Sequence, residues 1–351
     1  MKQNGPNLVE RTIYFDYIRV FATFAVIILH ISAQNWYSTD VNGFDWQVFN
    51  FFDSIVRWGV PVFVMISGAL FLSRDIQLKT IYTKYILRMI ISYDVWSSVY
   101  ALFTKGSIFD KIVAFSTGHY HMWFILMIVG IYMCIPFIKP IVENDNKIRY
   151  FLLLAFLFAF IIPEFITLAN DFGNVLVING AKTISTYAKK MNMHIVLGYA
   201  SYFVLGYYIN KIILSKRQRL IIYVLGVIGF ITTIGLSLLV ALKTQTYCGN
   251  YYGEFTVNVF FEALAMFTWF KHRNYNNNRI NVFIQKLSKY SFGAYLIHAL
   301  VIEQLNLQLG LNTLSFNSVF AVFFIGIIVF IISFSVSALL NQIPIIKKYM
   351  V

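Results

Sequence analysis

Long uninterrupted apolar runs are the feature that most limits what this chain can fold into. Each is about 20 residues long, enough for a helix to cross the hydrocarbon core of a bilayer. Of the 351 residues, 59% are hydrophobic and only 12% are charged, about half the charge of a soluble domain. The sequence therefore predicts an all-α polytopic membrane protein with about ten transmembrane helices. The expected spans are 13–35, 47–72, 85–104, 121–140, 150–169, 193–211, 219–242, 254–271, 289–309 and 317–343.

The basic residues predict how these spans are oriented. Loops on one side carry 20 of the 28 Lys and Arg residues, loops on the other side carry 6, and Arg19 and Arg57 lie inside spans. The richer set includes both ends of the chain, beginning with Lys2 and Arg11. Because cytoplasmic loops are enriched in Lys and Arg, both termini are expected in the cytoplasm. An even number of spans agrees with this orientation.

Several other classes of protein are disfavoured. The net charge is +13, but no basic face with aromatic stacking platforms exists outside the spans, so no nucleic-acid partner is expected. Cys134 and Cys248 do not indicate a disulfide framework. The first apolar run lacks a small-residue cleavage site and is interpreted as a helix. We expect one transmembrane domain over 1–351 without an appended soluble domain. The longest outside loop, 170–192, is interpreted as a solvated connector, with a cover over an outer vestibule as the alternative.

Ionisable side chains inside a span are costly and usually face a cavity or one another. In the first span Arg19 and His30 are eleven residues apart, which places both on one helix face with a rise of roughly 16 Å between them. Asp16 lies one turn before Arg19, where it can pair with it. Arg19 alone could snorkel to the inner headgroups, and His30 alone could be a packing histidine. Together on one face they favour a polar cavity.

The second span carries a further set of candidates. Arg57 is expected near the middle of the membrane, and Gly59 and Pro61 can kink or open the helix beside it. Ser67 and Gly68 permit the close approach of a ligand or of a neighbouring helix, and helix packing is the simpler interpretation.

Two more spans begin with candidate side chains. Arg88 lies at the start of the third span, where it could contact a bound molecule or only contribute to the orientation of the span. The fourth begins on the outer side with His119, His121 and Trp123, although Trp123 is also typical of an interfacial aromatic belt. Two histidines two residues apart without a nearby carboxylate or cysteine make a poor metal site, so no metal is expected. The ionisable residues of the later spans are interpreted as structural hydrogen-bond partners: Glu164, Glu262, His298 and Glu303.

Several of these segments together resemble the acyltransferase 3 family of integral membrane acyltransferases. The first helix has the family's pattern of arginine, ten residues and histidine at Arg19 and His30, and an Arg-x-x-Ala variant with Ala22. The segment 63–68 is similar to Phe-Phe-x-x-Ser-Gly, with Val64 where the family often has phenylalanine. Three further segments carry the resemblance, the first of them as His-x-Trp-aromatic: 121–124, 202–207 and 291–298.

The resemblance implies ten helices that carry an acyl group, usually acetyl, from cytoplasmic acyl-CoA to a hydroxyl or amine outside. Typical acceptors are cell-envelope or exported glycans. Some relatives append an extracellular hydrolase-like domain, whereas this chain resembles the stand-alone branch. We therefore expect an acetyl-CoA-dependent O-acyltransferase of the plasma or inner membrane, with a glycan or glycolipid acceptor among membrane lipids. A homodimer is compatible with this expectation.

The residues of the spans supply a mechanism for such a transfer. Arg19, Arg57 and Arg88 would bind the phosphates of acyl-CoA by charge-assisted hydrogen bonds, with Ser67 beside the donor. The pantetheine arm would extend outward to His30, which acts as a general base or as a transient acyl carrier.

Three further side chains complete this hypothesis. Asp16 would orient Arg19, and His121 and Trp123 would shape the acceptor end.

A transporter or flippase of a glycan or lipid-linked intermediate is the alternative, because buried Arg and His residues fit that function as well. A membrane sensor or scaffold with degenerate sites is a third interpretation. An acyl ester left on the acceptor distinguishes the enzyme from the transporter.

Overall fold

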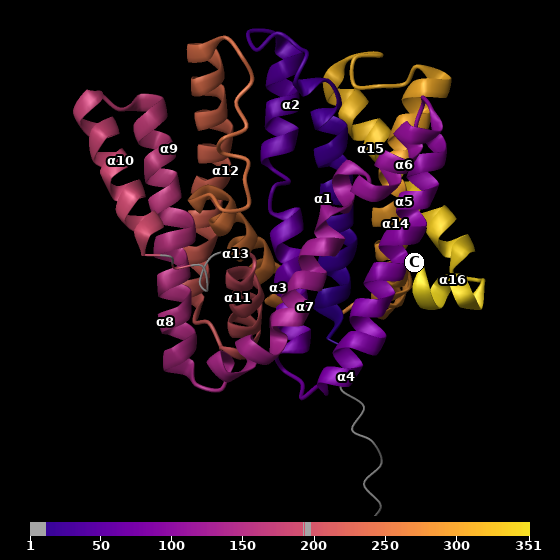
Figure 1. The fold of residues 1–351 in the computed structure, drawn as a ribbon, viewed down its shortest axis with the longest axis horizontal. Coiled ribbons are helices and arrows are strands. Elements are labelled where there is room, and N and C mark those ends of the chain that lie inside the picture. The colour runs from indigo at the N-terminus through magenta and orange to yellow at the C-terminus, as the bar shows by residue number, and fades with distance from the viewer. Residues whose placement is uncertain (1–11, 192, 194–197) are drawn as a thin grey trace, which may run out of the picture.

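The computed structural model describes residues 12–191, 193 and 198–351, and shows helices packed side by side in one bundle (Figure 1). No strand occurs in this described part. Seven helical segments are long and apolar enough to cross a membrane, which confirms the predicted all-α polytopic membrane protein. They are Ile13–Trp36, Phe44–Phe71, Leu78–Phe103, Ile108–Val142, Asp145–Phe172, Lys216–Thr244 and Ser318–Leu340.

Three other expected spans coincide with the helices α11 (Ala200–Lys211), α13 (Val257–Lys271) and α14 (Asn278–Leu309). The first two have only 12 and 15 residues, and the 32-residue α14 carries polar side chains along much of its length. The number of ten spans and the cytoplasmic location of both termini therefore stay predictions. Lys2 and Arg11, which contributed to the predicted orientation, lie outside the described residues.

Most of the remaining helices follow the expected apolar runs in order, and three lie between or after those runs, at 108–117, 175–190 and 344–349. Four of the seven segments named above combine two or three consecutive helical pieces, including short π-helical and 3₁₀ segments that continue an α-helix. Their bounds are α4 (Leu78–Thr80), η1 (Ile81–Ile86), α5 (Leu87–Phe103), α6 (Ile108–Thr117), η2 (Tyr120–Met122), α7 (Trp123–Val142), α8 (Asp145–Ala155), η3 (Phe156–Ile161), α9 (Ile162–Phe172), α10 (Val175–Lys190), α12 (Lys216–Thr244), α15 (Ser318–Leu340) and α16 (Pro344–Tyr349).

Helix α1 (Ile13–Trp36) is the central helix of the bundle. It packs against α13, α14 and α15 and against the two pieces of the second span. Apolar side chains occur almost all around it, including the fully buried Ile18, Ile27 and Ile31, as expected of a helix surrounded by other helices. The few polar side chains of α1 therefore face other helices or internal space.

The second span is interrupted beside Arg57. It consists of α2 (Phe44–Ser54) and α3 (Gly59–Phe71), with a turn at 55–58 between them. Pro61 lies in the first turn of α3. Backbone N–H groups have no intrahelical partner there, so proline, which lacks the N–H, costs the helix no hydrogen bond. Gly59 lies against α1, where an added Cβ would be 3.3 Å from the side chain of Val26. The break expected from Gly59 and Pro61 is thus present, and Arg57 lies within it.

The segment 170–192 differs from its interpretation as a solvated connector. Most of it forms helix α10, which packs against α9 and continues downward beside it in Figure 1. Asn174 caps this helix, because its side chain accepts a hydrogen bond from the backbone N–H of Val177 at 3.1 Å. The polar residues that suggested a loop are therefore partly cap and partly exposed helix surface.

Candidate active site

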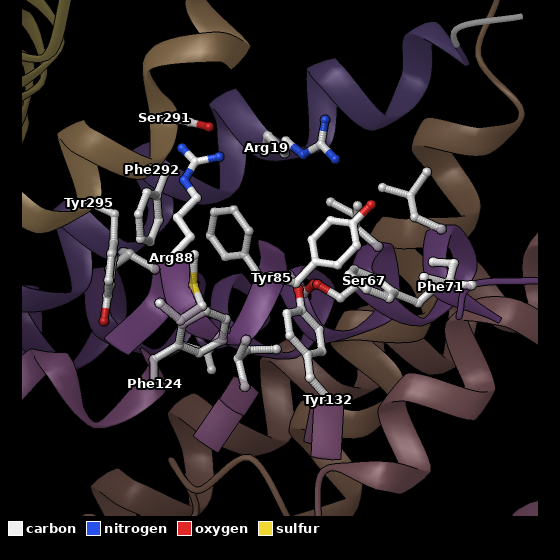
Figure 2. A pocket seen from close by; sticks show the side chains of 18 of the residues that line it. Arg19, Ser67, Phe71, Tyr85, Arg88, Phe124, Tyr132, Ser291, Phe292 and Tyr295 are labelled. Atoms are coloured by element: carbon white, nitrogen blue, oxygen red, sulfur yellow. The ribbon is translucent and has the colours of Figure 1, made fainter. Parts of the chain in front are cut away.

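A cavity of about 360 Å³ lies among α1, α3, α5, α7 and α14 (Figure 2). One end is basic and is lined by Arg19, Arg74 and Arg88. Most of the remaining wall is apolar or aromatic. Val26 also lines the cavity, and it precedes His30 by one turn on α1. The cavity therefore extends from the three arginines along the helix face that leads to His30.

The basic end is held by contacts around Arg19 and Arg88. Arg19 lies 3.6 Å from the carboxylate of Asp16, which is buried, as their one-turn spacing allows. Arg88 donates a hydrogen bond to the carbonyl of Val351 at 2.5 Å and lies over the ring of Phe292. Its Nε has no hydrogen-bond partner within the described residues. Arg88 thus keeps donor capacity for a further anionic group.

The chain end beside Arg88 is bound along one face of α5. Arg88, Ser92 and Trp96 follow one another at four-residue spacing, so they share that face. They donate hydrogen bonds of 2.5, 2.7 and 2.9 Å to the backbone carbonyls of residues 351, 349 and 350, respectively. This tail closes one side of the bundle next to the basic end of the cavity.

Ser67 and Gly68 face different neighbours. Ser67 lines the cavity, and its hydroxyl donates to the carbonyl of Phe63 at 3.0 Å. Gly68 faces α11, where an added Cβ would lie only 1.7 Å from the carbonyl oxygen of Phe203. Of the two interpretations of this pair, helix packing therefore applies to Gly68, while Ser67 faces the space that a ligand would occupy (Figure 2).

Four imidazole rings gather behind the cavity wall formed by Val26 and Tyr295, and none of them lines the cavity itself. We refer to His30, His119, His121 and His298 as the histidine cluster. The ring of His30 stacks on that of His298, with 5.1 Å between centroids, and lies 6.4 Å from that of His121. The rings of His121 and His298 are 5.0 Å apart. The three helical segments that supply the cluster, α1, the start of the fourth span and α14, therefore meet at this point.

Tyr295 connects the cavity with the histidine cluster. Its side chain lines the cavity, its ring lies 5.4 Å from that of His121, and its hydroxyl donates to the backbone carbonyl of His121. Its own backbone carbonyl accepts a 2.5 Å hydrogen bond from Nδ1 of His298. A molecule that fills the cavity thus ends against a residue that contacts two members of the cluster.

The other hydrogen bonds of the cluster extend to an acidic side chain. Nδ1 of His119 lies 2.8 Å from Nδ1 of His121, and Nε2 of His119 lies 2.8 Å from a carboxylate oxygen of Glu303. The ring of Tyr100 stacks on His119 at 4.0 Å. In contrast, Nε2 of His121 and Nε2 of His298 are buried and have no hydrogen-bond partner in the described part of the chain. The described residues leave the hydrogen-bonding capacity of those two nitrogens unused.

Two predicted site residues lie away from the cavity. Arg57 is in the break between α2 and α3, where it pairs with buried Asp53 at 2.5 Å and stacks over the ring of Tyr252 at 4.1 Å. Trp123 is 40% exposed and contacts the ring of Tyr199 at 5.7 Å. The structure brings together the remaining predicted residues around one cavity and one cluster: Asp16, Arg19, His30, Ser67, Arg88 and His121.

Sequence reasoning missed several residues of this site. Arg74 was counted only among the basic loop residues, and it lies in the turn that follows α3, three residues beyond Phe71. His298 and Glu303 were interpreted as structural, and His119 was given no role at the acceptor end. No local pattern distinguishes such residues, because their partners come from distant segments. Three tyrosines complete the wall of the cavity: Tyr85, Tyr132 and Tyr295.

Among the described residues, no three His, Cys, Asp or Glu side chains are placed together so that they could hold a metal ion. The histidine cluster instead combines ring stacking with hydrogen bonds between its members.

Comparison with known protein families matches the chain to the family model of the acyltransferase domain over residues 12–338. The chain belongs to the acyltransferase 3 family. No curated protein and no solved structure matches it. The family match includes the basic end of the cavity and the whole histidine cluster, so both belong to the acyltransferase domain. The protein is therefore a multi-pass membrane acyltransferase, in agreement with the resemblance seen in the sequence.

Proposed function

We propose that this acyltransferase transfers an acetyl group from cytoplasmic acetyl-CoA to a hydroxyl of an extracytoplasmic glycan or glycolipid, at the plasma or inner membrane. The observation that carries the proposal is a single cavity that extends from three arginines toward the histidine cluster. A reaction whose donor and acceptor are on opposite sides of a membrane needs such a connection between the two sides.

The basic end supports a polyanionic donor. Arg19, Arg74 and Arg88 all line it, and guanidinium groups bind phosphate oxygens through paired, charge-assisted hydrogen bonds. The apolar and aromatic wall beyond them suits the slender pantetheine arm, with the Ser67 hydroxyl as a polar contact. We leave Arg57 out of the donor site, because Asp53 and the ring of Tyr252 already compensate its charge.

The histidine cluster supports acyl transfer at the outer end. With the phosphates at the arginines, the thioester would reach the region of Val26 and Tyr295, next to His30. His30 either removes the proton of the acceptor hydroxyl or carries the acyl group between donor and acceptor. In both cases the hydroxyl oxygen forms the new ester bond. The sulfur of CoA leaves with its electron pair and ends as a thiol.

The proposal is tested with purified protein in liposomes, with radiolabelled acetyl-CoA on the cytoplasmic face and total envelope glycans outside. We expect label on the glycan with the wild-type protein and none with His30→Ala. Arg217→Ala, which changes an exposed arginine outside the cavity, should retain activity and serves as a control. Unmodified glycan that changes sides without label would instead support the alternative, a transporter of a glycan or lipid-linked intermediate.

A further inference from the structure

With Glu303 as a carboxylate and His119 as a neutral ring, the hydrogen bonds of the histidine cluster assign protons to particular ring nitrogens. An ionised carboxylate only accepts hydrogen bonds, so the Nε2 of His119 that faces Glu303 must be the protonated one. Nδ1 of a neutral His119 is then an acceptor, and the 2.8 Å contact requires a proton on Nδ1 of His121. Nε2 of His121 is left with a lone pair. This nitrogen is buried and makes no hydrogen bond of ordinary geometry within the described residues, although the His121 ring also interacts with the backbone of Leu296.

This arrangement is that of a base oriented by a chain of supporting groups. A carboxylate that accepts a hydrogen bond from a ring N–H fixes the tautomer of that imidazole. It also stabilises the imidazolium that forms when the ring takes up a proton. Here Glu303 acts on His119, which in turn acts on His121. Glu303 is 38% exposed and His119 is 17% exposed, whereas His121 is fully buried. The chain of hydrogen bonds therefore connects a half-exposed carboxylate with a base in the interior.

Resting on the proposed acyl transfer, we infer that His121 is the base that takes the proton of the acceptor hydroxyl, and that Glu303 and His119 are the residues that position it. The ring centroids of His30 and His121 are 6.4 Å apart and both rings contact that of His298, so an acyl group held at His30 would lie close to the His121 ring. His30 then remains free to hold or carry the acyl group.

The transfer step balances as follows. The hydroxyl oxygen attacks the acyl carbon, and its proton moves to Nε2 of His121. The bond from the acyl carbon to the leaving atom, either the CoA sulfur or a nitrogen of His30, breaks, and the electron pair stays with that atom. His121 then returns the proton to the leaving atom, so that the cluster ends in its starting state.

The variant Glu303→Gln tests this inference, with labelled acetyl-CoA as donor and envelope glycans as acceptor. An amide can orient His119 with either its oxygen or its nitrogen and carries no charge, so we expect kcat to fall about 100-fold, with the KM for acetyl-CoA unchanged within twofold. Glu303→Asp should recover part of the rate because it retains the carboxylate. Glu143→Gln, the same change at an exposed position, is the matched control and should behave as the wild type.

A second measurement separates positioning from a general structural effect. His119→Gln should lower kcat as much as Glu303→Gln, and the double variant should be no slower than either single one, because the two residues act as a unit. Wild-type rates in Glu303→Gln, or a loss that appears equally in donor affinity and thermal stability, would overturn the inference while the proposed function stands. A wild-type protein that transfers no acyl group would overturn both.

Discussion

The close crossing of α3 and α11 gives a sharp test of the packing around the cavity. Helices α3 and α11 meet at two glycines, Gly68 and Gly206. A Cβ at Gly68 would lie 1.7 Å from the carbonyl oxygen of Phe203, and one at Gly206 would lie 2.0 Å from the carbonyl oxygen of Met65. Both obstacles are backbone atoms, which cannot rotate away as a side chain can. Gly68→Ala is therefore a substitution that the two helices must accommodate by moving apart.

The size of the effect follows from these distances. Ordinary van der Waals contact begins at 3.4 Å. The two helices would therefore have to move apart by roughly 1.7 Å at Gly68, about half of a normal contact distance. Overpacking of a well-packed interior costs about 1–3 kcal/mol and sometimes more. Because a backbone atom is displaced, we expect about 3 kcal/mol, against a gain of at most about 1 kcal/mol in helix propensity.

Thermal unfolding of the detergent-solubilised protein measures this loss. We expect Gly68→Ala to lower the apparent Tm by about 5 °C or more. Because Ser67 is the next residue and lines the cavity, the variant should also bind acetyl-CoA more weakly. Gly130→Ala is the matched control: Gly130 also lies within a helix, α7, and an added Cβ there meets nothing within 4 Å.

Equal Tm values for Gly68→Ala and Gly130→Ala would refute this reasoning. They would mean that α3 and α11 are not in contact through their backbones at this crossing, and that the position of Ser67 at the cavity does not depend on it.

Three further predictions concern the charges and rings of the site. Asp53→Asn should destabilise the protein by about 3–5 kcal/mol because Arg57 loses its buried partner. A double-mutant cycle with Arg57→Met should show strong coupling, and additive losses of stability would contradict an ion pair between the two residues. Arg88→Gln should raise the KM for acetyl-CoA about tenfold with little change in kcat, and a KM insensitive to this change would remove Arg88 from the donor site. His298→Phe keeps a ring against His30 but loses the hydrogen bond of Nδ1, so kcat should fall more than tenfold; an unchanged kcat would make this ring a packing element only.

The first span shows how far local sequence reaches. Helix periodicity alone places Arg19 and His30 on one face and Asp16 one turn away, and the structure has Asp16 3.6 Å from Arg19. The residue types Gly59 and Pro61 also predict the helix break beside Arg57, because they act through the backbone of their own segment. These features depend only on the order of residues within one helix.

The partners across helices were not readable in the same way. His30 stacks on His298, and His119 binds Glu303 across 184 positions of the chain. Each of these side chains, seen alone, is equally consistent with a structural role. The sequence likewise gave Arg57 the same standing as Arg88, whereas a buried carboxylate and the ring of Tyr252 hold it away from the cavity.

The sequence by itself determined that this protein lies in a membrane, that it is helical, and that Arg19 and His30 share one face of the first helix. Apolar length and helix geometry are properties of consecutive residues, and a bilayer leaves the backbone few other ways to satisfy its hydrogen bonds. Only the tertiary structure decided which rings surround His30, which arginines share the cavity, and that Gly68 serves packing while Ser67 faces the ligand space. Those outcomes depend on how closely neighbouring helices approach and at what rotation, which is set by side-chain packing between segments far apart in the chain.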